Sequence, residues 1–234
     1  MTCESKRLMR KIKRLPLEQL EPLLLAVPEP PARLDWAVVF GNDHPVEIEV
    51  GFGKGLFLVT AASAQPETNF LGVEIMRKYQ LYAATRLVKR GLTNVRLCKA
   101  DARLLFRDAI ESESVAAIHV YFPDPWWKKR HHKRRVFTPE FIRECARILQ
   151  PGGKLLVATD VADYHTIICE LVEQNHSFQT IPPPEPHEPR HDMDYLTNFE
   201  RKFRQEGRTI YRMAWKRVAA SENNSGSNAA TTRR

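Results

Sequence analysis

Residues 46–55 read Val-Glu-Ile-Glu-Val-Gly-Phe-Gly-Lys-Gly and join a β-rich run to three glycines at alternate positions. The run predicts a buried strand, and the helical pattern that begins at Leu56 follows it at once. Gly51, Gly53 and Gly55 allow a tight turn and a close approach of the backbone to a ligand. A dinucleotide site favours the spacing GxGxxG rather than this GxGxG. We therefore expect a strand-to-helix turn at a ligand site, although turns of this kind join many strands to helices.

The same alternation of strand and helix patterns continues outward along the chain. Further strands are expected at 70–74, 95–99, 115–122, 154–158 and 209–215, and helical patterns at 56–63, 77–90, 138–149, 162–174 and from 197 onward. Such alternation predicts an α/β fold, a doubly wound and mostly parallel sheet with helices on both faces. A chain of 234 residues suits one catalytic domain, expected at 41–218. We expect residues 1–40 to form a basic arm with a short helix and residues 219–234 to form a disordered tail.

The charge, the cysteine content and the apolar runs of the sequence limit the kinds of partner expected for this domain. Lys and Arg outnumber Asp and Glu by 36 to 28, and the pI is about 9.4, so an anionic partner is plausible where the charge is concentrated. The four cysteines lie far apart in no ligand pattern, so we expect reduced thiols, no metal site and a cytoplasmic location. No apolar run approaches the roughly 20 residues that cross a bilayer, so no membrane association or export is expected.

Acidic residues stand where the predicted strands end. Glu74 and Asp101 follow the second and third strands, and Glu49 lies at the end of the first. In an open α/β sheet the ligand lies beyond the carboxyl ends of the strands, where a carboxylate can accept hydrogen bonds from ribose hydroxyls. Each acid could instead be an ordinary exposed residue at a strand end. Three in succession favour a nucleoside site, and its negative lining would suit a cationic cofactor.

Residues 122–135 are the most specific segment of the chain. Pro123 and Pro125 restrict the backbone around Asp124, whose carboxylate could accept hydrogen bonds from the N1 and N2 groups of a guanine. Trp126 or Trp127 could stack on a base, although packing explains a tryptophan here about as well. The run 128–135 holds six Lys or Arg and two His. Such a run is usually a solvated face, but beside a base-sized pocket we interpret it as a phosphate contact surface.

Two further segments have both a structural and a functional interpretation. Asp160 ends the fifth predicted strand, where it could contact substrate or cap the helix that begins at Ala162. Thr197 and Glu200 have the spacing of a capping box, and the residues alone favour that role.

Together these segments resemble the bacterial tRNA (guanine-N7-)-methyltransferase family. The matching pieces, spread over residues 46–216, are Glu49 to Gly55, Gly72 to Glu74, Ala100 with Asp101, Phe122 to Arg135, Ala158 to Asp160 and Thr197 to Tyr211. The Pro-Asp-Pro-Trp turn with its basic run distinguishes this family from other proteins far better than the glycine loop does. Trp127 departs from the pattern, because relatives often have proline or histidine there.

The resemblance implies a class I methyltransferase fold, which is Rossmann-like, and S-adenosylmethionine as cofactor. It places Asp124 at the reaction centre and implies cofactor contacts from Glu49, Gly51, Gly53, Gly55, Glu74, Asp101 and Asp124. It implies substrate contacts from Lys128, Asp160, Thr197, Asn198, Phe199 and Glu200, to which the basic run adds Arg130, Arg134 and Arg135. The implied product is 7-methylguanosine in tRNA, at the variable-loop guanine of position 46, made by a monomer or homodimer.

Guanine N7 carries a free lone pair, so such a reaction needs no general base, and none is apparent in the sequence. The nearest alternative is a methyltransferase for an exocyclic amine, which usually has an Asp/Asn-Pro-Pro-aromatic turn. A nucleotide-cofactor oxidoreductase is disfavoured by the GxGxG spacing. A non-catalytic RNA-binding module would leave the strand-end acids unexplained.

Overall fold

The fold is described from a computed structural model, which covers residues 13–27, 32–186, 188–189 and 195–219. The sequence before Lys13 and almost all of the expected tail lie outside the described residues. The short helix expected in the N-terminal arm is present as α1 (Leu17–Leu20), which continues into the 3-10 helix η1 (Glu21–Leu23).

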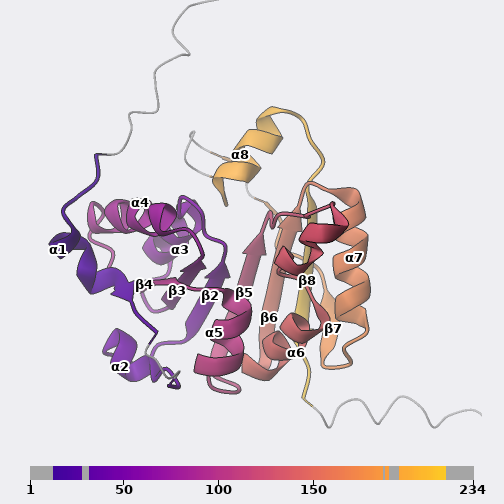
Figure 1. Ribbon diagram of the computed structural model, residues 1–234, viewed down its shortest axis with the longest axis horizontal. Helices are drawn as coiled ribbons and strands as arrows, with labels where there is room; N and C mark the ends of the chain where they lie inside the picture. The colour runs from indigo at the N-terminus through magenta and orange to yellow at the C-terminus, as the bar shows by residue number, and fades with distance from the viewer. Residues whose placement is uncertain (1–12, 28–31, 187, 190–194, 220–234) are drawn as a thin grey trace, which may run out of the picture.

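Eight strands form one sheet in the order β1-β4-β3-β2-β5-β6-β8-β7 (Figure 1). The strands are β1 (Leu24–Leu25), β2 (Val46–Val50), β3 (Asn69–Glu74), β4 (Val95–Lys99), β5 (Val115–Tyr121), β6 (Leu149–Thr159), β7 (Phe178–Ile181) and β8 (Tyr211–Arg217). Strand β8 runs antiparallel to β6 and β7, and the other strand pairs within the described residues are parallel. Strand order reverses between β2 and β5, and this switch point is where an open sheet of this kind binds its ligand. The predicted mostly parallel, doubly wound sheet is confirmed.

Helices cover both faces of the sheet. They are α2 (Trp36–Phe40), α3 (Leu56–Ala64), α4 (Arg77–Val88), α5 (Ala102–Ala109), α6 (Pro139–Ile148), α7 (Ala162–Glu173) and α8 (Asn198–Gln205), with a 3-10 segment η2 (Lys129–Arg134). One apolar cluster joins α1, α3 and α4 to β3 and β4, and the other joins α5, α6 and α7 to the opposite face. Thr138 is the N-cap of α6, because its hydroxyl accepts from the Phe141 amide at 3.2 Å.

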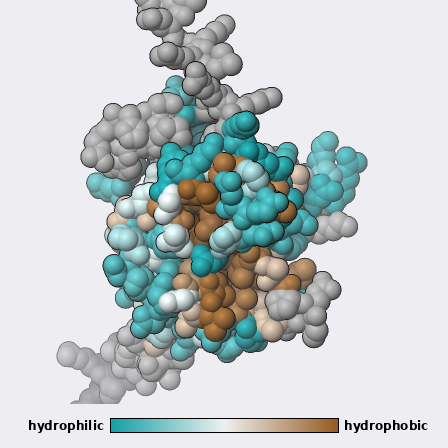
Figure 2. Space-filling model, turned by 90° about the vertical axis from the view of Figure 1, so that its left-hand side faces the viewer, coloured by the Kyte–Doolittle hydropathy of each residue, from teal (hydrophilic) through white to brown (hydrophobic). Residues whose placement is uncertain are grey.

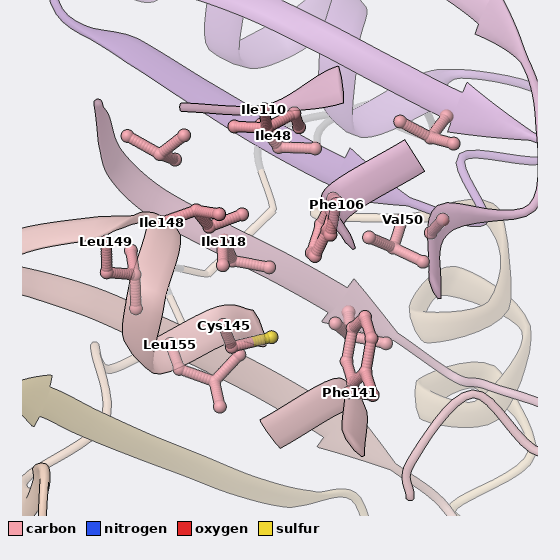
Figure 3. Packing of buried hydrophobic residues seen from close by; sticks show 14 of the residues in the cluster. Ile48, Val50, Phe106, Ile110, Ile118, Phe141, Cys145, Ile148, Leu149 and Leu155 are labelled. Atoms are coloured by element: carbon pink, nitrogen blue, oxygen red, sulfur yellow. The ribbon is translucent and has the colours of Figure 1, made fainter. Parts of the chain in front are cut away.

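Packing in the apolar cluster of α5, α6 and α7 shows to which face of the sheet each β2 side chain points. Ile48 and Val50 point toward α5 and α6, where Phe106 and Phe141 stack with ring centroids 5.4 Å apart (Figure 3). Because side chains alternate along a strand, Glu49 points to the other face, the one that carries α3.

Several elements differ from the sequence prediction, among them β1 and α2, which lie within the expected arm. Helix α5 was not expected, although Leu105, Phe106 and Ala109 form a buried face; its eight residues make it shorter than the helices that periodicity identifies reliably. Strand β7 was not expected either, since its exposed Gln179 and Thr180 dilute the apolar pattern at the sheet edge. Strand β6 begins at Leu149 rather than at 154 and continues through the Pro-Gly-Gly segment.

The sheet edge at β1 is short and lies among apolar residues. Figure 2 shows the side of the molecule that carries α1, α2 and α4, with an apolar band between hydrophilic residues. Val38 of α2 is 80% exposed, and Leu17 of α1 is 45% exposed. A two-residue edge strand leaves few unpaired backbone groups for another chain to pair with.

Candidate active site

The glycine loop after β2 has left-handed backbone at each of its three glycines. The φ angles are +77° at Gly51, +50° at Gly53 and +66° at Gly55, a conformation that glycine adopts without steric cost. A Cβ on Gly51 or Gly53 would meet nothing within 4 Å, so open space adjoins the loop. A Cβ on Gly55 would lie 2.7 Å from Cβ of Ala83, so that glycine lets α3 and α4 pack closely.

Glu49, beneath this loop, is a buried carboxylate with an unsatisfied oxygen. It is 3% exposed, and its Oε2 has no hydrogen-bond partner among the described residues. Burial, together with the charge of Glu74, raises the pKa of Glu49 well above its usual value. A buried acceptor without a donor is costly, and a cationic N–H donor from a ligand would satisfy it.

Glu74, at the end of β3, is tied to the same loop. Its Oε2 accepts from the Gly53 amide at 3.1 Å, and its Oε1 accepts from the Met76 amide at 3.0 Å. Ile75 and Met76 beside it are 64% and 46% exposed. Sequence reasoning did not single out these two residues, whose exposed apolar side chains directly follow a strand-end acid.

Asp101, the third strand-end acid, is engaged within the protein. Its Oδ1 accepts from the Arg103 amide at 3.0 Å and caps α5, while its Oδ2 lies 2.6 Å from Arg103 Nη2. The hydrogen bond from the Arg103 side chain lowers the pKa of Asp101. The structure therefore brings Glu49 and Glu74 together at the glycine loop and gives Asp101 a capping role at the next strand end.

The Asp124 turn is held in a strained conformation. Phe122 has φ +53° and Trp126 has φ +43°, which residues with side chains rarely adopt. The Phe122 ring packs 5.4 Å from the Phe203 ring of α8, and Arg135 Nε donates to the Pro125 carbonyl at 2.6 Å. These contacts keep the exposed Asp124 at the carboxyl end of β5.

Two arginines of the basic run stack on the tryptophans of this turn. Arg134 lies over Trp126 at 5.0 Å, and Arg135 lies over Trp127 at 5.7 Å. Arg135 also lies 5.6 Å from the ring centroid of buried Tyr164. Lys128 and Arg130 are exposed and can meet a partner in solution.

Asp160 is not a helix cap. The N-cap residue of α7 is Val161, which has no side-chain cap bond, and the Asp160 carboxylate instead forms an ion pair with Arg208. That pairing partner lies after α8, so neither spacing nor strand pattern could reveal it.

The segment that begins α8 does form the expected cap. Thr197 Oγ1 accepts from the Glu200 amide at 3.0 Å, and Glu200, which is 2% exposed, accepts from the Leu196 amide and from Arg212. Asn198 is half-buried, while Phe199 is 53% exposed and packs 6.1 Å from the Phe122 ring. α8 thus connects the Asp124 turn to β8.

A cavity of about 240 Å³ opens beneath α8. His119 and Tyr121 of β5 line it together with Phe57, Glu200, Arg204 and residues 183–186. His119 bonds Glu47 Oε2 at 2.8 Å and Tyr121 Oη at 2.9 Å. Asp124 and Asp160 do not line this cavity. Sequence reasoning missed the network, although a histidine within an apolar strand run was its signal.

Comparisons with known proteins identify methyltransferases as relatives of this chain. Residues 43–213 match a family described as putative methyltransferase. The tRNA (guanine-N(7)-)-methyltransferase of Rhodopirellula baltica is 45% identical over 193 residues, covering 80% of this chain and 71% of the relative. The enzyme of that name from Vibrio parahaemolyticus serotype O3:K6 is 37% identical over 187 residues, covering 80% and 78%. The chain belongs to the tRNA (guanine-N(7)-)-methyltransferase family.

Solved structures support the fold expected of this methyltransferase family. The 16S rRNA methyltransferase KamB matches with TM-score 0.57 and 17% identity, over 79% of this chain and 93% of that one. The aminoglycoside resistance methyltransferase NpmB1 matches with TM-score 0.52 and 18% identity, over 74% and 87%. The predicted class I methyltransferase architecture is confirmed.

Within the residues that the structure describes, no cluster of His, Cys, Asp and Glu could hold a metal ion. No helix in those ranges is long and apolar enough to cross a membrane.

Proposed function

We propose that this chain transfers the methyl group of S-adenosylmethionine to N7 of a guanine in tRNA, the variable-loop guanine at position 46. The observation that carries the proposal is the unpaired, buried carboxylate oxygen of Glu49 beneath a glycine loop that adjoins open space. Two relatives of the same printed name, at 45% and 37% identity, supply the substrate class. We further propose residues 41–218 as the catalytic domain, working in the cytoplasm.

The residues at the carboxyl ends of β2 and β3 fit such a cofactor. Glu49 would accept from its ammonium group, and the glycine loop would let its backbone lie close. Glu74 would hold the ribose hydroxyls through oxygens that already order the loop at Gly53. Ile75 and Met76 would cover one face of the adenine. The negative lining suits a ligand that carries both an ammonium and a sulfonium charge.

The cofactor supplies an electrophilic methyl group when bound, so the protein has to align and stabilise rather than activate. Guanine N7 attacks with its own lone pair, and the chain needs no general base. The exposed Asp124 carboxylate would accept from the N1 and N2 donors of the guanine and hold N7 in line. Because methylation leaves the purine cationic, the same carboxylate stabilises the charge that grows on the ring.

The substrate would be held outside the pocket by the basic run. Lys128 and Arg130 are exposed beside the Asp124 turn, where phosphates of a bound RNA can reach them. Thr197, Glu200 and Asp160 would act mainly by fixing α8 and the strand ends, given their internal bonds. Asn198 and the exposed Phe199 are then the residues of that segment that face a substrate.

The test is identification of the methylated atom. Purified protein is incubated with S-adenosylmethionine that carries a labelled methyl group and with tRNA lacking the modification, and the digested nucleosides are separated by mass spectrometry. We expect labelled 7-methylguanosine, formed far more slowly by Asp124→Asn. Label on an exocyclic amine would instead support the nearest alternative enzyme class. Absence of any cofactor affinity would overturn the proposal.

A further inference from the structure

The helix α4 and the segments beside it form a second cationic surface, distinct from the run 128–135. No acidic residue occurs between Glu74 and Asp101. That stretch contains seven basic residues, namely Arg77, Lys78, Arg86, Lys89, Arg90, Arg96 and Lys99. A long one-sign stretch of this kind creates a local field that an anionic partner would relieve.

The C-terminal end of α4 lies against the end of the basic arm. Lys89 Nζ donates to the Lys13 carbonyl at 3.0 Å, which brings two segments far apart in sequence together. Lys13, Arg14, Lys89 and Arg90 are all exposed. Four cationic side chains are therefore available to solvent at this junction.

A buried arginine connects this junction to the glycine loop. Arg86 lies one turn before Arg90, is 3% exposed, and donates from Nη1 to the Lys54 carbonyl at 2.8 Å. Its Nη2 has no hydrogen-bond partner in the described part of the chain. Burial lowers the pKa of Arg86, and the charges of Arg90 and of Arg201 on α8 lower it further.

We call the exposed cations of this region the cationic strip: Lys13, Arg14, Lys54, Lys89 and Arg90. It runs from the N-terminal arm past α4 to the rim of the glycine loop. Strand β2 separates it from the run 128–135, because α4 follows β3 on one side and that run follows β5 on the other. Figure 1 shows α4 and α7 at opposite ends of the sheet, with α8 above its carboxyl edge.

We propose that the cationic strip binds the phosphate backbone of the RNA substrate, so that the RNA spans the active site between two basic surfaces. The inference rests on the proposed function. An RNA backbone presents regularly spaced negative charge over a distance that a single small anion cannot match. Contacts on both sides of β2 would fix the register of the RNA, and thus which base reaches Asp124, without reading sequence.

The test neutralises the part of the strip that is farthest from the cofactor. Lys89→Gln with Arg90→Gln removes two exposed charges, and the matched control Lys154→Gln with Lys216→Gln removes two from paired positions on β6 and β8. Binding of unmodified tRNA is measured across a series of KCl concentrations. We expect the strip variant to bind about tenfold more weakly at low salt, with its log–log salt slope smaller by about 1–2. The control should match the parent protein.

Three further measurements make the result decisive. Thermal unfolding should show that both double variants are folded, and their cofactor affinity should equal that of the parent. An unchanged salt slope in the strip variant would overturn the inference. The inference would also fail if polyglutamate of matched charge displaced tRNA from the parent as well as unlabelled tRNA does, because that would indicate a protein partner. If the parent makes no 7-methylguanosine, the proposed function fails, whereas the binding slopes still test the strip on their own.

Discussion

The two halves of the active-site edge adopt left-handed backbone in different ways. In the half that we propose for the cofactor, the residues at positive φ are Gly51, Gly53 and Gly55, which accept that conformation without help. In the half that we propose for the substrate, the residues at positive φ are Phe122 and Trp126, and the conformation costs about 1–2 kcal/mol at each. The first loop is specified by its own residues, and the second turn needs contacts from elsewhere.

Those contacts come from distant parts of the chain. Phe122 packs on Phe203 of α8, and Pro125 is held by Arg135, which stacks on Tyr164 of α7. Substitutions at these supporting positions should therefore disturb the reaction with RNA while sparing cofactor binding. The reverse should hold for the acid beneath the glycine loop.

The largest expected effect separates the two halves directly. Asp124→Ala should lower the single-turnover rate by about 100- to 1000-fold, because it removes the group that stabilises charge on the purine. Cofactor affinity, measured by titration in the same preparation, should stay within a few-fold of the parent value. A loss confined to cofactor binding would place Asp124 in the other half and break the comparison.

Glu49→Gln should act on the cofactor half alone. Loss of a charge-assisted hydrogen bond of about 1.5–3 kcal/mol predicts a cofactor Kd about 10- to 100-fold higher. Above the raised pKa of Glu49, the free variant should be more stable than the parent, by about 1 kcal/mol or a Tm difference of about 2–4 °C, since an unpaired buried charge disappears. An unchanged Kd would show that the unpaired oxygen serves no ligand.

The pH dependence of the parent protein follows from the raised pKa of Glu49, and Glu49→Gln should lack it. The folded free protein holds that proton more tightly than the unfolded chain, so the stability contributed by Glu49 is lost as pH rises through the raised pKa. A cationic ligand needs the ionised form, so its affinity should increase over the same pH range. Titration calorimetry of the parent should show this increase, and Glu49→Gln should not.

Local sequence signals predicted the parts of the site whose conformation is set by their own residues. The glycine loop, the acid at the end of β3 and the Thr197 cap follow from short motifs, and the structure places them as expected. The mostly parallel, doubly wound sheet follows from the alternation of strands and helices. The helix α5 escaped prediction although it has a buried apolar face, because it is only eight residues long.

The missed features share a different origin, because each depends on a partner that is distant in sequence. Glu47 pairs with His119 across two neighbouring strands, and Asp160 pairs with Arg208 beyond α8. The positive φ of Phe122 has no signature in its own residue type. Arg135 was interpreted as a phosphate contact from composition, whereas its contacts in the structure are with the turn itself.

Arg135→Gln should have the smallest effect of the three and is the sharpest test of the comparison. Without the guanidinium, the Pro125 carbonyl loses its donor and Trp127 loses its stacking partner, so Asp124 should be placed less accurately. We expect turnover at saturating tRNA to fall about tenfold, because small misplacements of a reacting group cost this much or more. Cofactor affinity and the salt slope of tRNA binding should not change.

Two controls separate support of the turn from contact with RNA. Arg130→Gln, in the same basic run but exposed, should reduce the salt slope of tRNA binding and leave saturated turnover intact. Tyr164→Phe keeps the ring beneath Arg135 and should behave as the parent, whereas Tyr164→Leu removes that ring and should reproduce Arg135→Gln. If Arg135→Gln instead behaved like Arg130→Gln, the residue would be a phosphate contact, and the turn would have to be held by the packing of Phe122 on α8 alone.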